Sequence, residues 1–445
     1  MLNQWHYLPS NLMKTELLSP AGTLKNMHYA FAYGADAVYA GQPRYSLRVR
    51  NNDFSQLDKL ATGIQTAHDL GKLFFIAANI APHNVKVKTF MKDIEPVIAM
   101  QPDALIMSDP GLIMMVRERF PDMVIHLSVQ MNTVNYASVK FWQTMGVKRI
   151  ILSRELSLDE VAEIRQECPD IELEMFIHGA LCIAYSGRCL LSGYFNHRDA
   201  NQGSCTNACR WDYNVVEGEE DIAGNIQPKE KKEKIYLVEE KQRKGEYMPI
   251  IEDEHGSYIM NSKDLRAVQH VQQLVDIGID SLKIEGRTKS HYYAARSTQV
   301  YREAIDDALA GKEFNTDLMS QLDNLANRGY TEGFYRRHLP EDYQNYEQGS
   351  STATQQQFVG EVLEYDNDKQ WLKIEAKNRF SVGDQLELML PSGNQRFVLE
   401  QMFDTDGNPM EVAKGSSYTV WIHCPLKESS HLGLLMRDLV EQATT

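Results

Sequence analysis

The chain has 445 residues, of which 43% are hydrophobic and 24% are charged, and its formal net charge is −15. This length predicts roughly two or three domains, with enough apolar side chains for a sizeable core. The negative charge disfavours non-specific binding to nucleic acid, because phosphate affinity is mainly electrostatic.

The first residues of the chain lack the basic and apolar stretches of a signal peptide. No apolar run approaches the ~20 residues that a membrane helix needs. We therefore expect a cytoplasmic protein with no membrane partner, whose thiols are free or bound to metal.

Short apolar runs recur up to residue 290, and each is followed by a stretch compatible with a helix. Continuous apolar strands separated by helices are typical of a parallel sheet that is covered on both faces. Eight such units without the glycine fingerprint of a dinucleotide-binding fold predict an α/β fold, a (β/α)8-like barrel over residues 1–339. The runs are 16–19, 37–40, 73–77, 104–107, 125–129, 149–152, 173–177 and 281–284.

Polar or turn-forming residues follow each of these runs. In a barrel such positions surround one mouth, where enzymes of this architecture build their sites. We therefore expect the functional groups among residues 19–22, 41–42, 79, 108–110, 130–132, 153–155, 178–179 and 285–287.

Four of the six cysteines fall within twenty-eight residues, directly after the seventh predicted strand. Clustered cysteines in a long chain without a secretory segment are more often metal ligands than disulfides, and four thiolates complete the shell of a zinc ion or an iron–sulfur cluster. The spacings of six, fifteen and three intervening residues match neither a zinc knuckle nor a ferredoxin run, so they predict a metal centre without choosing the metal. The alternative, buried thiols without a ligand, suits Cys168 and Cys424 better. The four clustered residues are Cys182, Cys189, Cys205 and Cys209.

The pattern of apolar and polar residues changes twice in the second half of the chain. A cysteine-rich insertion after strand seven covers residues 180–257 and contains a hairpin or flap, and helical spacing resumes over residues 262–275 and 290–309. Residues 340–356 form a linker. Short alternating strands with turn residues between them predict a small C-terminal β-barrel over residues 357–425, followed by a helix or tail over residues 426–445. The predicted strands are 358–363, 371–374, 385–388 and 418–422.

Charged residues after the eighth predicted strand are the best candidates for catalysis. Glu285 could manage a proton, and Arg287 could clamp a phosphate or a small carboxylic acid. Lys289 lies just beyond and could also contact a substrate. A structural ion pair in the barrel mouth is the alternative for these residues.

Two further groups are candidates for binding a nucleic-acid substrate. Tyr185 and Arg188 lie between the first two clustered cysteines and could contact a flipped base. Arg48 and Arg50 belong to a local basic segment that could grip RNA, the alternative being a solvated loop. His178 could be imagined as a base for Cys182 in a thiol peptidase, but a packing histidine is the better interpretation.

The stretch from residue 174 to 192 resembles the signature of the collagenase-like peptidase family, the letter-U class of unassigned mechanism. The matching residues are Glu174, Phe176, Gly179, Cys182, Gly187, Cys189 and Ser192. Residues 16–22, 34–39, 282–287 and 327–330 look like further landmarks of the family, so the resemblance covers essentially the whole chain.

Bacterial members similar to this chain are RNA- or quinone-hydroxylation proteins with a [4Fe–4S] cluster. The resemblance therefore implies that the four clustered cysteines hold such a cluster, with iron–sulfur assembly proteins as partners. Length, the added β-barrel and residues 48–52 place the chain nearest to members that hydroxylate tRNA. This placement implies tRNA as partner and formation of 5-hydroxyuridine at the wobble base, without molecular oxygen and with prephenate as co-substrate.

Two other functions stay open. One is a metal- or thiol-dependent peptidase, although the chain has neither a His-Glu-x-x-His helix nor a Gly-x-Ser-x-Gly elbow. The other is a non-catalytic scaffold that carries a cluster and delivers tRNA to a partner.

Overall fold

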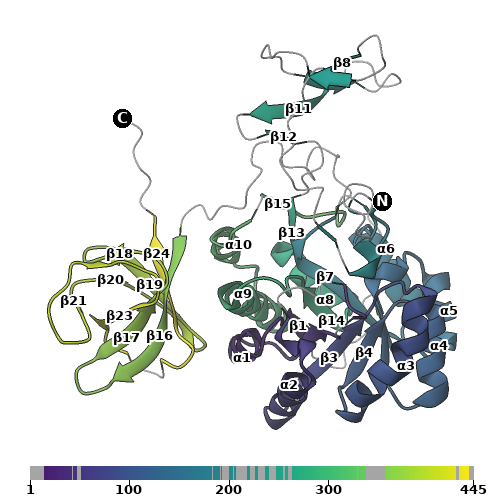
Figure 1. Ribbon diagram of the computed structural model, residues 1–445, viewed down its shortest axis with the longest axis horizontal. Helices are drawn as coiled ribbons and strands as arrows, with labels where there is room; N and C mark the ends of the chain where they lie inside the picture. The colour runs from purple at the N-terminus through teal and green to yellow at the C-terminus, as the bar shows by residue number, and fades with distance from the viewer. Residues whose placement is uncertain are drawn as a thin grey trace.

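The computed structural model describes the larger part of the chain, which forms a barrel and a second, all-β domain (Figure 1). The described residues are 15–42, 44–47, 52–182, 184–190, 192, 200–203, 205–206, 263–327, 329–336, 356–426 and 430–439, with the backbone of short strands between 218 and 258.

Eight parallel strands form the closed barrel, because β14 pairs with both β1 and β7. Each strand overlaps one of the apolar runs, which confirms the barrel predicted from the sequence. The strands are β1 (Glu16–Pro20), β2 (Ala37–Gly41), β3 (Leu73–Ala78), β4 (Ala104–Met107), β5 (Ile125–Leu127), β6 (Arg149–Ile151), β7 (Glu172–Ala180) and β14 (Ser281–Ile284).

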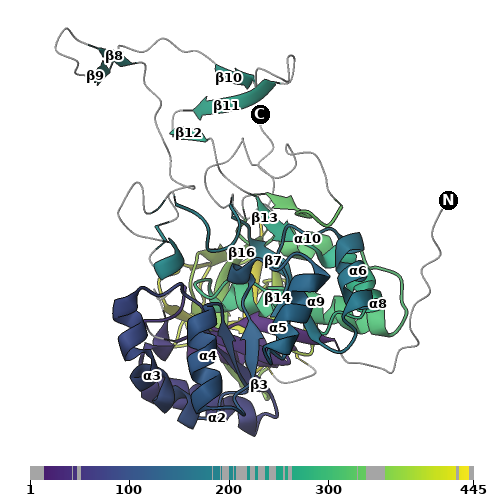
Figure 2. The same ribbon diagram turned by 90° about the vertical axis from the view of Figure 1, so that its right-hand side faces the viewer.

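Helices cover the outside of the barrel (Figure 2). Local signals fix where several of them begin: Asp109 caps α4 ahead of Pro110, and Ser157 and Glu160 form a capping box at α6. Within the described residues, none of the helices is both long and apolar enough to span a membrane. They are α1 (Leu24–Ala32), α2 (Leu57–Asp69), α3 (Asn84–Ala99), α4 (Pro110–Arg119), α5 (Tyr136–Thr144), α6 (Leu158–Glu167), α8 (Val271–Ile277), α9 (His291–Leu309) and α10 (Asp317–Asp323).

Strand β7 extends beyond its neighbours toward the mouth. Its last residues pair with β13 (Asp264–Arg266), which runs antiparallel to it, and β13 pairs in turn with β15 (Tyr330–Thr331). The sequence predicted a helix from residue 262, and this was wrong at its start, because the extended end of β7 offers the returning chain backbone partners. The chain becomes helical at residues Val268–His270, a short 3-10 helix that leads directly into α8.

Charged side chains fill part of the barrel interior. Arg149 of β6 donates to Glu16 of β1 at 2.7 Å and to Glu174 of β7 at 3.3 Å, and Lys283 of β14 donates to Glu174 at 2.7 Å. All four side chains are buried or nearly so. Burial lowers the pKa of Lys283 although Glu174 opposes the shift. Because a buried charge is costly without a partner, these pairs hold β7 against its neighbours β6 and β14 and join β6 to β1 across the barrel.

The insertion forms two small antiparallel sheets in its described strands, consistent with the predicted hairpin. One contains β8 (Gly218–Glu220) and β9 (Ile226–Pro228). The other contains β10 (Tyr236–Glu239), β11 (Tyr247–Asp253) and β12 (Gly256–Tyr258).

The C-terminal domain is built on an antiparallel seven-stranded sheet of order β20-β19-β24-β16-β17-β23-β21. Strand β24 lies within residues 426–445, where the sequence predicted a helix or tail. That prediction was wrong, because β24 begins with three consecutive buried apolar residues, Leu434, Leu435 and Met436, and pairs with both β16 and β19 inside the sheet. The strands are β16 (Gln356–Asp366), β17 (Trp371–Ala376), β18 (Phe380–Ser381), β19 (Gln385–Leu390), β20 (Gly393–Val398), β21 (Met402–Phe403), β22 (Val412–Ala413), β23 (Tyr418–His423) and β24 (Leu434–Asp438).

This domain packs against α1 and α9 of the barrel (Figure 1). Arg296 of α9 is fully buried and donates to Glu387 of β19 at 2.8 Å. Burial alone would raise the pKa of Glu387, but the charge of Arg296 and hydrogen bonds from Gln356 and Arg296 lower it. Tyr33, which caps the C-terminal end of α1, donates a hydrogen bond from its hydroxyl to the carbonyl of Met389 at 3.0 Å.

Replacing Arg296 by methionine should lower the free energy of unfolding by about 3–5 kcal/mol, because Glu387 then stays buried without its main countercharge. Urea denaturation monitored by circular dichroism measures this change. Arg396 is the matched control, since it lies 3.7 Å from the same carboxylate with a side chain that is 62% exposed. Arg396→Met should cost less than about 1 kcal/mol. Equal losses in the two variants would contradict the importance of the buried pair.

Candidate functional site

The clustered cysteines follow β7 at the mouth of the barrel. Cys182 lies two residues after the strand and is exposed, Cys189 is half-buried, and Cys205 is exposed. None of these three forms a disulfide, and Cys209 lies outside the described residues. Among the residues that the structure describes, no three His, Cys, Asp or Glu side chains are gathered closely enough to hold a metal ion.

The other two cysteines belong to the packed interior. Cys168 ends α6, and Cys424 follows β23. Burial raises the pKa of both thiols, that of Cys424 to about 12. These residues are inert packing groups, as the sequence predicted.

Hydrogen bonds hold the two cysteine-bearing segments together and against the barrel. We call residues 181–192 the first cysteine segment and residues 200–206 the second. The Ser192 hydroxyl accepts from the backbone N–H of Thr206 at 2.9 Å, which joins the two segments. The Asn132 amide donates to the carbonyl of Ser186, and the N–H of Ala81 donates to the carbonyl of Asn201. Both segments therefore lie over the ends of β3 and β5.

Gly187 lets the first cysteine segment approach the barrel. Its φ is +73°, and a Cβ at this position would lie 3.0 Å from Cγ of Gln130. A larger residue would be strained by its backbone and would push against Gln130. The glycine between the first two cysteines is therefore required by the close approach of this segment.

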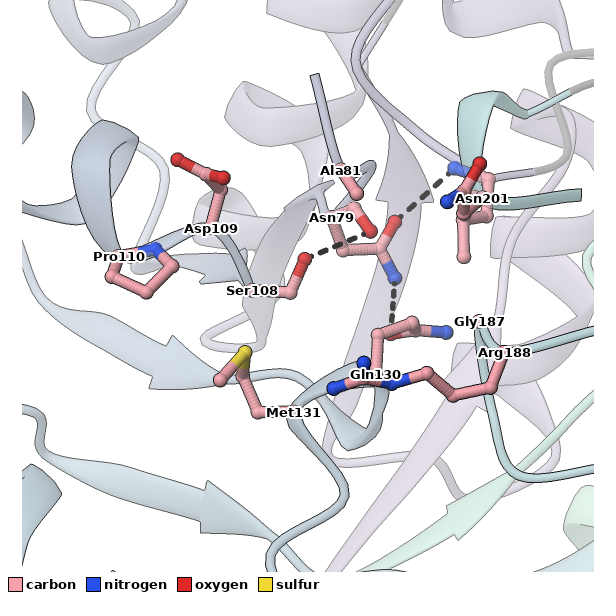
Figure 3. Close-up of a pocket in the computed structure, with 11 residues that line it drawn as sticks. Asn79, Ala81, Ser108, Asp109, Pro110, Gln130, Met131, Gly187, Arg188 and Asn201 are labelled. Carbon is pink, nitrogen blue, oxygen red and sulfur yellow. Dashed lines mark hydrogen bonds between the residues drawn. The ribbon is translucent and has the colours of Figure 1, made fainter. Parts of the chain in front are cut away.

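A cavity of about 280 Å³ lies beneath the cysteine segments (Figure 3). This volume is near the lower limit for small-molecule sites and suits a single ring better than a peptide chain. Polar residues at the ends of β3, β4 and β5 line it, together with Leu47, Arg188 and Asn201. The residues from the strand ends include Asn79, Ser108, Asp109 and Gln130.

Asn79 connects the ends of four consecutive strands at this cavity. Its Oδ1 accepts from the N–H of Leu47 after β2, and its Nδ2 donates to Gln130 Oε1 after β5 at 3.0 Å. Its carbonyl accepts from the Ser108 hydroxyl after β4 at 3.0 Å. Figure 3 shows Asn79 between Ser108 and Gln130, with Arg188 passing beside Gln130. The cavity wall is therefore rigid where these strands end.

The charged residues after β14 do not line this cavity, although Arg287 contacts its wall. Arg287 is buried and donates to the Ser46 hydroxyl at 2.6 Å and to the carbonyl of Leu47. Glu285 is also buried, and the Nζ of Lys289 lies over the ring of Tyr293 at 5.3 Å. Arg287 thus fixes the Leu47 wall of the cavity.

The predicted substrate-binding residues fall into two groups. Tyr185 has 52% of its surface exposed, and Arg188 is exposed and lines the cavity. Both are available to a molecule that approaches the mouth. Arg48 and Arg50 lie outside the described residues.

His178 is a packing residue, as the sequence predicted. It is buried among Tyr293 and Tyr301 of α9 and Tyr330 of β15, with ring centroids 5.5–5.7 Å apart. Burial, with the positive charges of Lys289 and Arg266, lowers the pKa of His178 from 6.5 to about 3. The imidazole is therefore neutral at physiological pH and enclosed by aromatic rings.

The sequence predicted that most residues of the cavity wall lie at the barrel mouth, but it did not predict that they form a binding cavity. Asn79, Ser108, Asp109 and Gln130 each follow a predicted strand, which was the available signal. Asn201 was missed, because it reaches the cavity from an insertion whose path has no sequence periodicity.

Comparisons with known proteins agree with the resemblance seen in the sequence. The model for peptidase family U32 matches residues 22–345, and the model for the C-terminal domain of that family matches residues 354–437. The tRNA hydroxylation protein P of Escherichia coli K12 is 60% identical over 97% of this chain and 99% of its own length. The protein of that name from Haemophilus influenzae is 58% identical over 97% and 98%. The 23S rRNA 5-hydroxycytidine C2501 synthase of E. coli K12 is 28% identical over 92% of this chain and 56% of its own length.

The low pKa of His178 gives a test of a thiol-peptidase mechanism. Because the folded pKa of about 3 lies below the ordinary 6.5, the ring should remain neutral from pH 8 down to about pH 4. The unfolded chain binds a proton below pH 6.5, so His178 should lower the stability of the fold as the pH falls through that range. Nitrogen-15 NMR of labelled histidine, assigned with His178→Gln, measures the titration. A His178 signal that titrates near pH 6.5 would contradict this burial.

Proposed function

The chain belongs to peptidase family U32, and we propose that this member hydroxylates tRNA. The observation that carries the proposal is the identity of 60% and 58%, over nearly full length, to two tRNA hydroxylation proteins. Similarity of this extent includes both domains, so it supports the same activity for the whole chain.

In its finer form, the proposal names 5-hydroxyuridine at the anticodon wobble position as the product. The net change replaces C5–H of uracil by C5–OH: with water as the source of oxygen, the base gives up two electrons to an acceptor and two protons are released. We propose prephenate as co-substrate and no requirement for molecular oxygen, as the family resemblance implies. The protein would act in the cytoplasm, where tRNA and iron–sulfur assembly proteins are its partners.

We propose that Cys182, Cys189, Cys205 and Cys209 hold a [4Fe–4S] cluster. The donor set suits the group, because the described members are disulfide-free thiols in two hydrogen-bonded segments and outside the apolar core. The thiols are not gathered in the described residues, so ligation and closure of the two segments would be coupled. When bound, a cluster of this kind supplies electron transfer beside the cavity.

The residues around the cavity support binding of a flipped nucleotide. The small cavity would enclose one base, and the exposed guanidinium of Arg188 would meet an RNA phosphate at its rim. Tyr185 presents an exposed ring on which a neighbouring base can stack. Arg48 and Arg50 would extend the positive surface, in contrast to the acidic average of the chain.

Glu285 and Arg287 retain a proposed part in the reaction. Glu285 would accept or deliver a proton at the mouth, and Lys289 would lie near an anionic substrate group. Arg287 would meet a small carboxylic acid only by leaving Ser46 or by using a further donor, because two of its nitrogens already donate to protein oxygens. A peptidase mechanism has less support, because His178 is buried among aromatic rings and its pKa is lowered to about 3, which makes it a poor proton acceptor for a thiol nucleophile.

The cluster proposal predicts that anaerobically purified protein is brown and contains about four irons and four sulfides per chain. Cys205→Ala should lose most of the iron, whereas Cys168→Ala should retain it because Cys168 is buried at the end of α6. Iron and sulfide assays with visible absorption measure both. Stoichiometric zinc without sulfide would overturn this assignment.

The hydroxylation proposal predicts that a strain carrying Cys182→Ala or Cys189→Ala lacks 5-hydroxyuridine derivatives in its tRNA and accumulates unmodified uridine. Mass spectrometry of tRNA nucleosides gives the result. Normal modification in both strains would refute the hydroxylation proposal.

Glu285→Gln separates catalysis from loss of the cluster, since it removes a charge and keeps the side-chain volume. We expect this variant to stay folded and brown but to lose most of the modification. Unimpaired modification would leave Glu285 with a structural role.

A further inference from the structure

In the hydrogen bond between Leu47 and Asn79 at the cavity, the donor and the acceptor are certain. The backbone N–H of Leu47 lies 3.2 Å from Asn79 Oδ1, and a backbone N–H can only donate. The carbonyl of Leu47 accepts a hydrogen bond from Arg287. Both the N–H and the carbonyl of Leu47 are therefore held by the barrel. The Asn79 amide is therefore oriented with its oxygen toward Leu47 and its nitrogen toward β5.

This orientation determines which end of the Gln130 amide faces the cavity. Asn79 Nδ2 donates to Gln130 Oε1 at 3.0 Å, and the Ser128 hydroxyl donates to the same oxygen. Gln130 Oε1 thus accepts two hydrogen bonds from the protein. Its Nε2 has no acceptor within the part of the chain that the structure describes, and Gln130 lines the cavity. The relay from Leu47 through Asn79 leaves an N–H donor for a ligand.

Packing limits the ability of Gln130 to turn this donor away. A Cβ added at Gly187 would lie 3.0 Å from Cγ of Gln130 and 3.4 Å from its Cβ, so the first cysteine segment approaches this half-buried side chain closely on one side. Rotation of the amide by 180° would place Nε2 against the nitrogen of Asn79, two donors facing each other. The donor is thus fixed by contacts on both sides.

On the basis of the proposed function, we propose that Gln130 is the residue that selects uracil over cytosine, by donating from Nε2 to the oxygen on C4 of the target base. Uracil carries an acceptor at C4, whereas cytosine carries an amino group that only donates at this position. A cytosine in the cavity would leave two donors facing each other, which costs more than a lost contact.

The same contact orients the base for its reaction. C5 is bonded to C4, so a uracil held by its C4 oxygen presents C5 next to Gln130 and the first cysteine segment. Recognition of the base and placement of the reacting carbon therefore use the same contact.

The test compares the affinity of the full-length, anaerobically purified protein for three anticodon stem–loop RNAs that carry uridine, cytidine or no base at the wobble position. Fluorescence anisotropy gives the three dissociation constants. We expect the wild type to bind the uridine RNA about tenfold more tightly than the other two. The ratio of constants is measured on one preparation, so it does not depend on the fraction of folded protein.

Gln130→Glu is the informative variant. A glutamate has the same length and still accepts from Asn79 and Ser128, but it presents an acceptor to the cavity. We expect it to lose the preference for uridine or to reverse it in favour of cytidine. Val134→Glu is the matched control, because Val134 follows β5, is 38% exposed and does not line the cavity. The added negative charge should therefore weaken the binding of all three RNAs equally.

The outcomes separate this inference from the proposed function. Absence of binding to any of the RNAs, together with normal tRNA modification in a deletion strain, would remove the function itself. Binding by a wild type that does not distinguish uridine from cytidine would overturn only the role of Gln130. If Gln130→Glu kept the preference for uridine over cytidine, the role of Gln130 would likewise be overturned.

Discussion

The buried carboxylate of Glu174 is the interaction on which the geometry of the barrel depends. It lies on β7 and accepts from Arg149 of β6 and Lys283 of β14, the two parallel neighbours of that strand. A fully buried carboxylate must keep such partners, because its desolvation is otherwise uncompensated. The register of β7 is therefore fixed relative to both neighbours. Since the first cysteine segment continues from the end of β7, this register also fixes where that segment begins.

At the mouth, rigidity comes from neutral hydrogen bonds. Asn79 joins the ends of β2, β3, β4 and β5 without any charge, and the cysteine segments are attached to the same strand ends through Asn132 and Ala81. The amide groups that line the cavity, from Asn79, Gln130 and Asn201, suit a nucleobase, whose edges are hydrogen-bond donors and acceptors. The charged residue that lines the cavity from the exposed rim, Arg188, suits a phosphate.

The C-terminal domain adds no group to the cavity in the described residues, because the lining residues all belong to the barrel and its insertion. It packs against α1 and α9 through a buried ion pair, while the cavity lies at the ends of β3 to β5. Although the family is named for peptidases, the described part of the site contains a cavity lined by amide groups and a buried, neutral histidine. Chemistry at the site and attachment of the second domain use different parts of the barrel.

The sequence by itself determined the barrel, because each buried strand is a continuous apolar run and each is followed by a helix. It also determined that polar residues such as Asn79, Asp109 and Gln130 meet at one mouth, since the carboxyl ends of parallel strands share one edge. Its local patterns failed at β13 and β24, where strand formation depends on a pairing partner distant in the sequence.

Only the tertiary structure decided what the polar residues do. The sequence left Arg287 as either an anion clamp or a structural ion-pairing residue, and the fold places Ser46 and Leu47 within its reach. The direction of the Gln130 amide depends on Asn79, and that of Asn79 on the N–H of Leu47. Such a relay joins three loops that are far apart in the chain, so no spacing along the sequence reveals it. A residue type sets which hydrogen bonds are available, and the packing of distant segments sets which of them remain for a ligand.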